Sequence, residues 1–503
     1  MRVFPLLAYL AVSSMAIGAP SPTATLLDLA KKKFAPRKLT DAEVELFVAA
    51  EKGDAASCLS YNQNEDDPAI AWTWNDRAIH AECLTWLCTD SEASKRVTYR
   101  GIDINGMRID GRVDLSFAEI SFPLKTWKCA FMQGIDLLYA RTRGLYFQTT
   151  YVHDLAADGA KIEGSVFLRR DFKAEGQVEF KAAAITGDVD CHSGHFSAAT
   201  SQSDDDTNAA LSFNSAKIQG NVYLMDAFEA EGEVDLMNSE MKGLSLGDLS
   251  GKKTSINLRS AKATILRDEQ LTWPEEGHLF LDGFTYERIH GNPPFAATAP
   301  IQWLRRQPHD TFLPQPYEQL ASVLKNMGYE REARLVMIEK NQDHANFTKR
   351  FSQEWWWYNV FGRLIGYGYA PSRAFFISLG MIALGWLLFH LCYVGNIITP
   401  ADERGYVKDP AGQIVLEDGR RRFSEDYPKF NALVFSLESF TPLLKLDQSE
   451  SWTPNANRGV SIHFLGLHFT TGSLARVYLW FHIVAGWVLT SLWVGGITGL
   501  VKS

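Results

Sequence analysis

The stretch GSVFLRRDFKAEGQVEFKAAAITGDVDC, residues 164–191, repeats one short pattern three times. The pattern is the pentamer Gly-x-Val-x-apolar, which begins at Gly164, Gly176 and Gly187. The two apolar residues of each pentamer are two positions apart, which is typical of a half-buried β-strand. The glycine ahead of each strand allows a turn between flat faces. We therefore predict short strands joined by tight turns.

The same pentamer recurs over a longer part of the chain. The further matches are GRVDL at Gly111, GNVYL at Gly220 and GEVDL at Gly232. Because glycine makes up about 7% of residues in an average protein, roughly one match is expected by chance. Six matches therefore indicate a true repeat.

The spacing of the glycines defines the repeating unit. The steps from Gly164 to Gly176 to Gly187 are 12 and 11 residues, and the steps from Gly220 to Gly232 to Gly243 repeat them. This predicts a unit of about 23 residues with two strands. One such unit cannot bury its apolar side alone, so successive units must stack. We predict a mainly β fold, a pentapeptide-like β-solenoid over residues 99–290.

One gap in the repeat is longer than the others. Gly187 and Gly220 are 33 residues apart, which is one coil plus ten residues. The surplus falls in the polar stretch SAATSQSDDDTN, residues 197–208, and predicts a loop that bulges from one coil. The register is less regular before Gly164 and after Gly243.

The N-terminal part divides into a secretion signal and a helical cap. Residues 1–19 carry an early arginine, an apolar stretch and small residues suited to cleavage, which is typical of a signal peptide. An uncleaved anchor is the alternative, and it would export the rest of the chain in the same way. Residues 20–98 have a helical pattern. Thr40 and Glu43 form a capping box, and Ile79, Cys83 and Trp86 step by four and three along one face of a second helix.

Residues 291–350 are predicted to form a proline-rich connector and a helical hairpin. The hairpin runs from about Pro316 to Asp343 and turns at Gly328. A single hairpin is expected to cap the open end of the solenoid. Residues 351–373 are rich in tryptophan, tyrosine and arginine, a composition expected at a membrane interface.

Two long apolar stretches follow, residues 374–397 and 477–501. Each is long enough to cross a bilayer core of ~30 Å. The loop between them, residues 398–476, contains a shorter apolar stretch, Phe430 to Leu446, which suits an interfacial or re-entrant helix. With the signal peptide, this predicts a bacterial inner-membrane protein whose solenoid lies on the periplasmic side.

Composition and charge limit the classes of partner that the chain is expected to bind. The chain has 503 residues with 46% hydrophobic and 22% charged residues, and its formal charge of −9 is spread along its length. Nucleic acid is therefore not expected as a partner. Six cysteines are too few for a disulfide scaffold, although Cys58, Cys83 and Cys88 could pair or stay as buried thiols.

Motifs for catalysis are weak. Gly243-Leu-Ser245-Leu-Gly247 matches a nucleophile elbow, but it is in register with the solenoid glycines and no helix pattern follows. Cys191, His192 and His195 lie close in sequence, but Cys191 occupies an inward position of its coil, so no metal is expected. Signatures of nucleotide, zinc-protease and dithiol sites are absent. We therefore expect no cofactor, and the catalytic and cofactor-binding residues stay unknown.

Polar residues also occur on the predicted strands and in or near the apolar segments. The acidic residues Asp114, Asp188, Asp190 and Asp235 alternate with buried positions and are expected on the solvated face. His390 and Glu438 lie near or in apolar segments, where polar groups are often functional, although a histidine near a span end can reach the interface.

Several phrases resemble an uncharacterised bacterial family whose members are often labelled membrane-associated oxidoreductase or pentapeptide-repeat-like protein. These phrases include AKIEGSVFL from Ala160, PQPYEQLASVLKNMGYEREARLVMIEK from Pro314 and YLWFHIVAGWVLTSLWVGGITGLV from Tyr478. The resemblance covers nearly the whole chain after the signal and implies a redox activity at the membrane.

The two apolar spans also resemble two-helix ion channels, some of which carry pentapeptide repeats. Residues 431–442 stand where a pore helix would, and Gly495, Gly496 and Gly499 could let the second span bend. The Thr-Val-Gly-Tyr-Gly filter is absent, so potassium selectivity is not predicted.

Three hypotheses follow. The first is a non-enzymatic envelope protein, anchored in the bilayer, whose solenoid presents a surface to an envelope protein or polymer. The second is a homo-oligomeric channel or pore, and the third is the oxidoreductase that the family label implies.

Overall fold

The computed structural model describes residues 24–60, 63–197, 209–247, 254–268, 273–290, 299–417, 420–464 and 467–498. The predicted signal peptide and most of the predicted 197–208 loop and proline-rich connector lie outside these residues. The chain forms two compact units that divide between Gln319 and Leu320. Each unit is described by itself.

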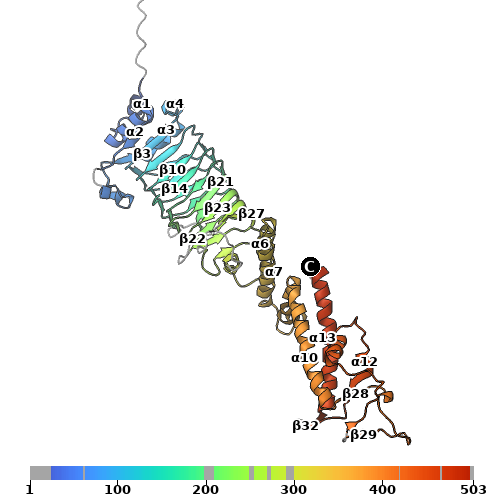
Figure 1. Cartoon of the computed structure of the whole chain (residues 1–503). Helices are drawn as coiled ribbons and strands as arrows, with labels where there is room; N and C mark the ends of the chain where they lie inside the picture. The colour runs from blue at the N-terminus through green and yellow to red at the C-terminus, as the bar shows by residue number, and fades with distance from the viewer. Residues whose placement is uncertain are drawn as a thin grey trace, which may run out of the picture. The chain divides into compact units, whose positions relative to one another are not determined.

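The first unit contains a β-solenoid of about eight turns with ~22 residues per coil, between residues 102 and 290. All of its paired strands are parallel, and each strand that is not at the end of a face pairs with the strands one coil earlier and one coil later. Figure 1 shows the coils stacked in chain order from β3 to β27. The predicted solenoid is therefore confirmed.

The early coils have four short strands rather than the predicted two. We number the four sides of the coil as faces 1 to 4. Face 1 comprises β3 (Ile102–Asn105), β6 (Leu124–Trp127), β10 (Leu145–Gln148), β14 (Val166–Arg169) and β18 (Val189–Asp190). Face 2 comprises β4 (Arg108–Asp110), β7 (Ala130–Phe131), β11 (Tyr151–Val152), β15 (Lys173–Ala174) and β19 (His195–Ser197). Face 3 comprises β5 (Val113–Asp114), β8 (Ile135–Asp136), β12 (Leu155–Ala156), β16 (Val178–Glu179) and β20 (Ala209–Ser212). Face 4 comprises β9 (Arg141–Thr142), β13 (Lys161–Ile162) and β17 (Ala184–Ile185).

From residue 217 on, the coils have two strands, as predicted. Strand β21 continues both face 4 and face 1, because Lys217 pairs with Ala184 and Val222 pairs with Val189. Strand β22 likewise continues faces 2 and 3. The strands are β21 (Lys217–Leu224), β22 (Glu229–Asp235), β23 (Glu240–Leu246), β24 (Thr254–Asn257), β25 (Lys262–Asp268), β26 (Leu279–Phe280) and β27 (Thr285–His290). The pentamers occur only on faces 1 and 3. For this reason the pattern did not predict the strands on faces 2 and 4 of the early coils.

The register is regular at both ends of the repeat, contrary to the expectation from sequence. Ile102 pairs with Leu124 before the first regular glycine, and Leu266 pairs with Ile289 after the last. The corner between faces 3 and 4 needs the left-handed conformation, which glycine takes at Gly159 and Gly283 and non-glycine residues take in the other coils. The non-glycine residues are Phe117, Tyr139, Ala182, Ser215, Asn238 and Ser260, with φ between 54° and 61°.

The helical cap begins as predicted and then joins the solenoid. It comprises α1 (Leu26–Phe34), α2 (Asp41–Lys52), the 3₁₀ turns η1 (Gln63–Asp66) and η2 (Pro68–Thr73), α3 (Ala81–Thr89) and α4 (Ala93–Arg96). The capping box of Thr40 and Glu43 starts α2, and Gly53 ends it at φ 77°. The prediction for Ile79 is wrong, because β2 (Ala78–His80) pairs with β4 and β1 (Ala56–Ser57) pairs with β3. Pairing with the first coil overrides the helical spacing.

The other end of the solenoid is also covered. The helix α5 (Ala299–Leu304) brings Trp303 against Trp273, with ring centroids 4.7 Å apart. The first turn of α6 (Gln315–Asn326) hydrogen-bonds the last coil, since the Gln315 amide donates to Phe284 O at 3.1 Å and the Gln319 amide donates to Tyr286 O at 2.6 Å.

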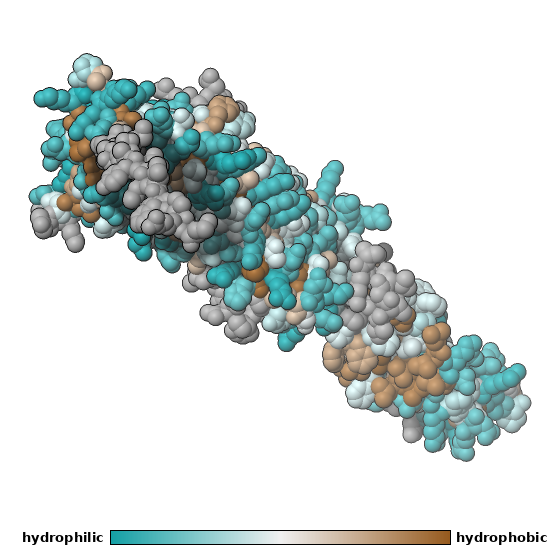
Figure 2. All heavy atoms as spheres, turned by 90° about the horizontal axis from the view of Figure 1, so that it is seen from above, coloured by the Kyte–Doolittle hydropathy of each residue, from teal (hydrophilic) through white to brown (hydrophobic). Residues whose placement is uncertain are grey.

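The second unit begins within α6 and contains two long apolar helices, α10 (Pro371–Val394) and α13 (Thr471–Thr498). Their apolar segments, Ser372–Val394 and Thr471–Gly495, have mean hydropathies of 2.0 and 1.6 and are largely exposed. In Figure 2 the apolar residues gather in a brown band at this part of the chain, with a polar end beyond it. By length and composition both helices could cross a membrane.

Shorter elements complete the second unit. They are α7 (Glu330–Ala345), α8 (Gln353–Trp356), the π-helical turn η3 (Trp357–Phe361), α9 (Gly362–Ile365), η4 (Gly366–Gly368), β28 (Ile398–Pro400), η5 (Glu403–Gly405), β29 (Leu416–Glu417), β30 (Arg420–Arg421), α11 (Ala432–Phe440), α12 (Gln448–Ser451), β31 (Trp452–Pro454), β32 (Ser461–Phe464) and β33 (Leu467–Thr470). The predicted turn of the helical hairpin is present at Gly328, whose φ is 89°. The predicted short apolar helix is α11, which packs against both α10 and α13.

Candidate functional sites

A groove runs along face 2 of the solenoid beneath the turn η2. Its larger part has a volume of ≈ 470 Å³, and a neighbouring part of ≈ 300 Å³ shares four of its lining residues. The shared residues are Pro68, Ala69, Tyr151 and Lys173. The two parts are therefore one continuous groove.

Two rows of outward side chains form the floor of the groove. The strand register places Tyr151, Lys173, His195 and Glu229 in one row. The second row includes Ser197 and Glu231, which pair with each other, and Glu175 lines the groove two residues after Lys173. Strands in a sheet are ~4.8 Å apart, so each row offers a new side chain at that interval.

The floor is acidic and its members contact one another. The Tyr151 hydroxyl donates to Glu175 at 2.7 Å, and burial together with this carboxylate raises the pKa of Tyr151. His195 Nδ1 lies 3.1 Å from Glu229 Oε2. Among the described residues that line this part, the carboxylates are Glu175, Glu229 and Glu231 and the lysine is Lys173. The larger part of the groove therefore favours a ligand without negative charge.

The wall of the groove is an exposed tryptophan on a fixed turn. Trp72 in η2 is 69% exposed. An ion pair of 2.7 Å between Asp66 and Arg77 holds the turn, and Asp67 caps it by accepting the Ala69 N–H. The Arg108 guanidinium also donates to Trp72 O at 3.1 Å. These contacts hold the backbone of Trp72 at the edge of the groove that the carboxylates also line.

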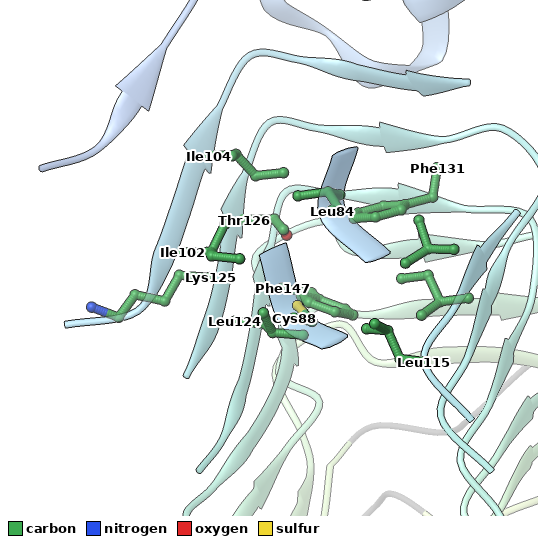
Figure 3. A pocket seen from close by; sticks show the side chains of 12 residues that line it. Leu84, Cys88, Ile102, Ile104, Leu115, Leu124, Lys125, Thr126, Phe131 and Phe147 are labelled. Carbon is green, nitrogen blue, oxygen red and sulfur yellow. The ribbon is translucent and has the colours of Figure 1, made fainter. Parts of the chain in front are cut away.

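A second cavity lies inside the first coils, where α3 covers the open end of the solenoid. Figure 3 shows Leu84 and Cys88 of α3 beside Ile102, Ile104 and Phe147, with Lys125 turned away. Its volume is ≈ 30 Å³ and its lining is mostly apolar, and the hydroxyl of Thr126 is already bonded to that of Thr150. A space of this size could hold one water molecule, but the lining would offer that water no free hydrogen-bond partner. The cavity is therefore a packing gap and not a ligand site.

The structure separates Cys191, His192 and His195. Cys191 is fully buried and points into the solenoid, and burial raises the pKa of its thiol. His192 contacts Asp190 and Asp226, whereas His195 faces the groove. No group of three or more metal-binding side chains occurs in the described part of the chain.

Ser245 lies within strand β23 and is 2% exposed, where it pairs with Tyr223 and Arg267 of the adjacent coils. It is a strand residue and not the exposed tip of a turn.

The six cysteines are free thiols, including Cys58, Cys83 and Cys88.

The prediction for the strand aspartates is half wrong. Asp114 is exposed and Asp188 is half-buried, but Asp190 and Asp235 are 7% and 4% exposed. Each buried carboxylate accepts the backbone N–H two residues later, at 3.1 Å in Asp190 and 3.0 Å in Asp235. They stabilise the corner that follows the strand, and Asp190 also pairs with Arg169 at 2.6 Å.

A polar cluster joins the three apolar helices of the second unit. His482 of α13 is fully buried, and its Nε2 lies 3.3 Å from Ser436 Oγ and 3.1 Å from Ser436 O. The Ser436 hydroxyl donates to Ile382 O of α10 at 2.8 Å. A Cβ at Gly385 would collide with Ser436 and His482, so glycine lets the helices approach.

The two polar residues named from the sequence differ in their surroundings. His390 is exposed on α10. Glu438 is 7% exposed and accepts the Gln448 and Ser449 N–H groups at 2.9 and 3.0 Å, so it caps the start of α12. Gly495 and Gly496 lie in α13, and Gly499 lies outside the described residues.

The sequence missed the groove and the His482 cluster. Trp72 and the floor residues come from separate parts of the chain and meet only through the strand register. His482 lies within an apolar span, and a histidine at that depth is the signal that could have found it.

Comparison with known proteins gives no match to any family model, curated protein or solved structure.

Proposed function

We propose that the chain is a membrane-anchored envelope protein whose solenoid binds a linear glycan in the groove along face 2. The groove is the observation that carries the proposal. It combines a repeating floor, an exposed tryptophan wall and hydrogen-bonding side chains, and catalysis is not part of the proposal.

The repeat of the floor supports an extended polymer as the ligand. A polymer lying along the solenoid axis meets an equivalent pair of positions every ~4.8 Å. This interval is close to the length of one sugar unit in a linear β-linked glycan. The long, open form of the groove suits such a chain better than a compact molecule.

The side chains support sugar chemistry. Sugar rings have one apolar face, which stacks on an indole such as that of Trp72. Their hydroxyl groups can donate to Glu229 and Glu231 and accept from Lys173. Because the carboxylates outnumber the lysine, a neutral or amino-bearing glycan fits better than a polyanion.

The two apolar helices support anchoring in the bacterial inner membrane. Both are long enough to span a bilayer, and large apolar side chains such as Phe376 and Trp480 are 67% and 59% exposed. With the signal predicted for residues 1–19, the solenoid is expected on the periplasmic side, where envelope glycans are found.

The test is co-sedimentation of the purified full chain in mild detergent with isolated cell-wall sacculi. The expected result is binding that Trp72→Ala weakens at least tenfold. Phe117→Ala is the matched control, because Phe117 is 73% exposed at another corner of the solenoid and should leave binding unchanged. Equal binding by Trp72→Ala and the parent chain would reject the groove as the site.

Two other functions make different predictions. The packing of α11 between α10 and α13 favours a channel, which should give conductance in planar bilayers. The oxidoreductase implied by the family resemblance should carry a chromophore, which an absorbance spectrum of the purified protein would reveal.

A further inference from the structure

The short helix α11 enters the apolar helix pair from one end and stops near its middle. At its start, Phe430 stacks on Tyr393 and Ala432 packs in a core with Ile398 and Trp452, beside the end of α10. At its end, the Phe440 ring lies 5.2 Å from the His482 ring. A Cβ at Gly486 would collide with Phe440 O, so these backbones are in close contact.

The position of these contacts along α13 gives the depth of α11. Counted from Thr471 at 1.5 Å per residue, His482 and Gly486 lie ~17 and ~22 Å along the helix. A bilayer core is ~30 Å thick. If α13 crosses the bilayer, as the proposed function requires, Phe440 lies close to the middle of it.

The chain then returns through residues 441–447, which we name the re-entrant loop. It ends at α12, where the Gln448 side chain bonds the backbone of Lys429 and Asn431 at the start of α11. Leu443 is 88% exposed, Leu446 44% and Leu444 41%. The loop therefore has little cover from its own chain.

The backbone of this loop is also incompletely paired. The Leu444 N–H donates to Thr441 O at 3.2 Å, and the Leu446 N–H bonds Glu438. Among the described residues, the N–H groups of Leu443, Lys445 and Asp447 find no partner. Irregular backbone in a bilayer core must be buried in protein or line water, because lipid tails offer no hydrogen bonds.

We propose that other copies of this chain cover the re-entrant loop, so that the second unit forms a homo-oligomer with residues 441–447 at its centre. The loop carries one cation, Lys445, and one anion, Asp447, both exposed. In a symmetric assembly the same patch recurs on each copy, and Lys445 of one copy meets Asp447 of the next. The self-complementary charge selects a second copy as the partner.

The first test is oxidative cross-linking of Leu443→Cys in membranes that contain the full chain. The expected result is a disulfide-linked dimer from Leu443→Cys. The matched control is Phe376→Cys on α10, whose side chain is 67% exposed and which should stay uncross-linked. Equal cross-linking at both positions, or none at Leu443→Cys, overturns the proposal.

The second test is native mass measurement in detergent. The parent should have the mass of two or more chains, where one chain with its predicted signal peptide has a mass of 56.4 kDa. Lys445→Glu and Asp447→Lys should each weaken association at least tenfold, and the double variant should restore it. A single-chain mass at all concentrations overturns the proposal.

Alkaline extraction of the same membranes separates this proposal from the proposed function. A chain that resists extraction but stays monomeric contradicts only the assembly. A chain that is released from the membrane contradicts the anchor and the assembly together.

Discussion

The solenoid and the second unit differ in how much large apolar surface they leave exposed. In the solenoid, inward residues such as Val166, Val189 and Val222 are fully buried, and charged residues cover the outside. In the second unit, Phe376 and Trp480 are exposed, whereas His482 and Ser436 are fully buried. Burial of apolar surface drives folding only in water. This difference is what the proposal of a water-facing solenoid and a lipid-facing second unit predicts.

The largest expected effect is in the solenoid core. Phe196 lies between Phe172 and Phe228, with ring centroids 5.5 Å away on both sides. Phe196→Ala should destabilise the solenoid by ~3–5 kcal/mol, because it removes a buried aromatic and leaves a cavity. Chemical unfolding of the full chain in detergent measures this. Phe376→Ala, on the exposed surface of α10, should change stability by no more than ~0.5 kcal/mol.

The second prediction concerns the buried carboxylate of Glu43 and the pH dependence of stability. Burial alone would raise the pKa of Glu43, but Arg37, the Thr40 backbone and His80 outweigh it and lower the pKa to about 2. This group therefore stabilises the fold above its ordinary pKa of 4.5, and the contribution is lost as pH falls toward 2. At about 1.36 kcal/mol per pKa unit, the contribution is on the order of 3 kcal/mol. Thermal unfolding between pH 3 and 7 should show this loss, and Glu43→Gln should flatten the curve.

The close approach of helices in the second unit is tested by two glycines. Gly486→Ala should destabilise this unit by ~1–3 kcal/mol, since the new Cβ collides with Phe440 O. Gly380→Ala is the control, because no atom lies within 4 Å of a Cβ built there. Equal melting temperatures for the two variants in detergent would reject the packing of α11 on α13.

The smallest expected effect concerns the polar cluster. Ser436→Ala should cost ~0.6–1.7 kcal/mol, the range for hydrogen bonds between helices in membranes. Ser378→Ala removes only a bond to Ala374 O of the same helix and should cost less. Thermal unfolding in detergent compares the two. A larger loss for Ser378→Ala would contradict the role of Ser436 in joining the helices.

The sequence was sufficient for elements that repeat or that are long. The pentamers predicted the solenoid because every coil buries the same pattern of apolar residues. The two apolar helices were predicted from the length of their apolar segments. The four-sided form of the early coils was missed because strands such as β11 and β13 have only two residues. Ile79 was misassigned because its strand partner, Ile109, is 30 residues away.

The candidate sites were predictable only in part. His195 was named from the sequence, but its place beside Glu229, 34 positions later, depends on the register of two stacked strands. Trp72 reaches the groove because Asp66 pairs with Arg77, a contact that no short motif records. Glu438 was named from the sequence as a polar group in an apolar segment, but its contacts with the start of α12 depend on the fold.

Alkaline carbonate extraction of membranes from cells that produce the full chain tests the contrast between the two parts most directly. The account predicts that the chain stays in the membrane pellet, because the exposed apolar surfaces of α10 and α13 are covered by lipid. Release of the folded chain into the supernatant would contradict it, since those surfaces would then have to be covered by protein in water.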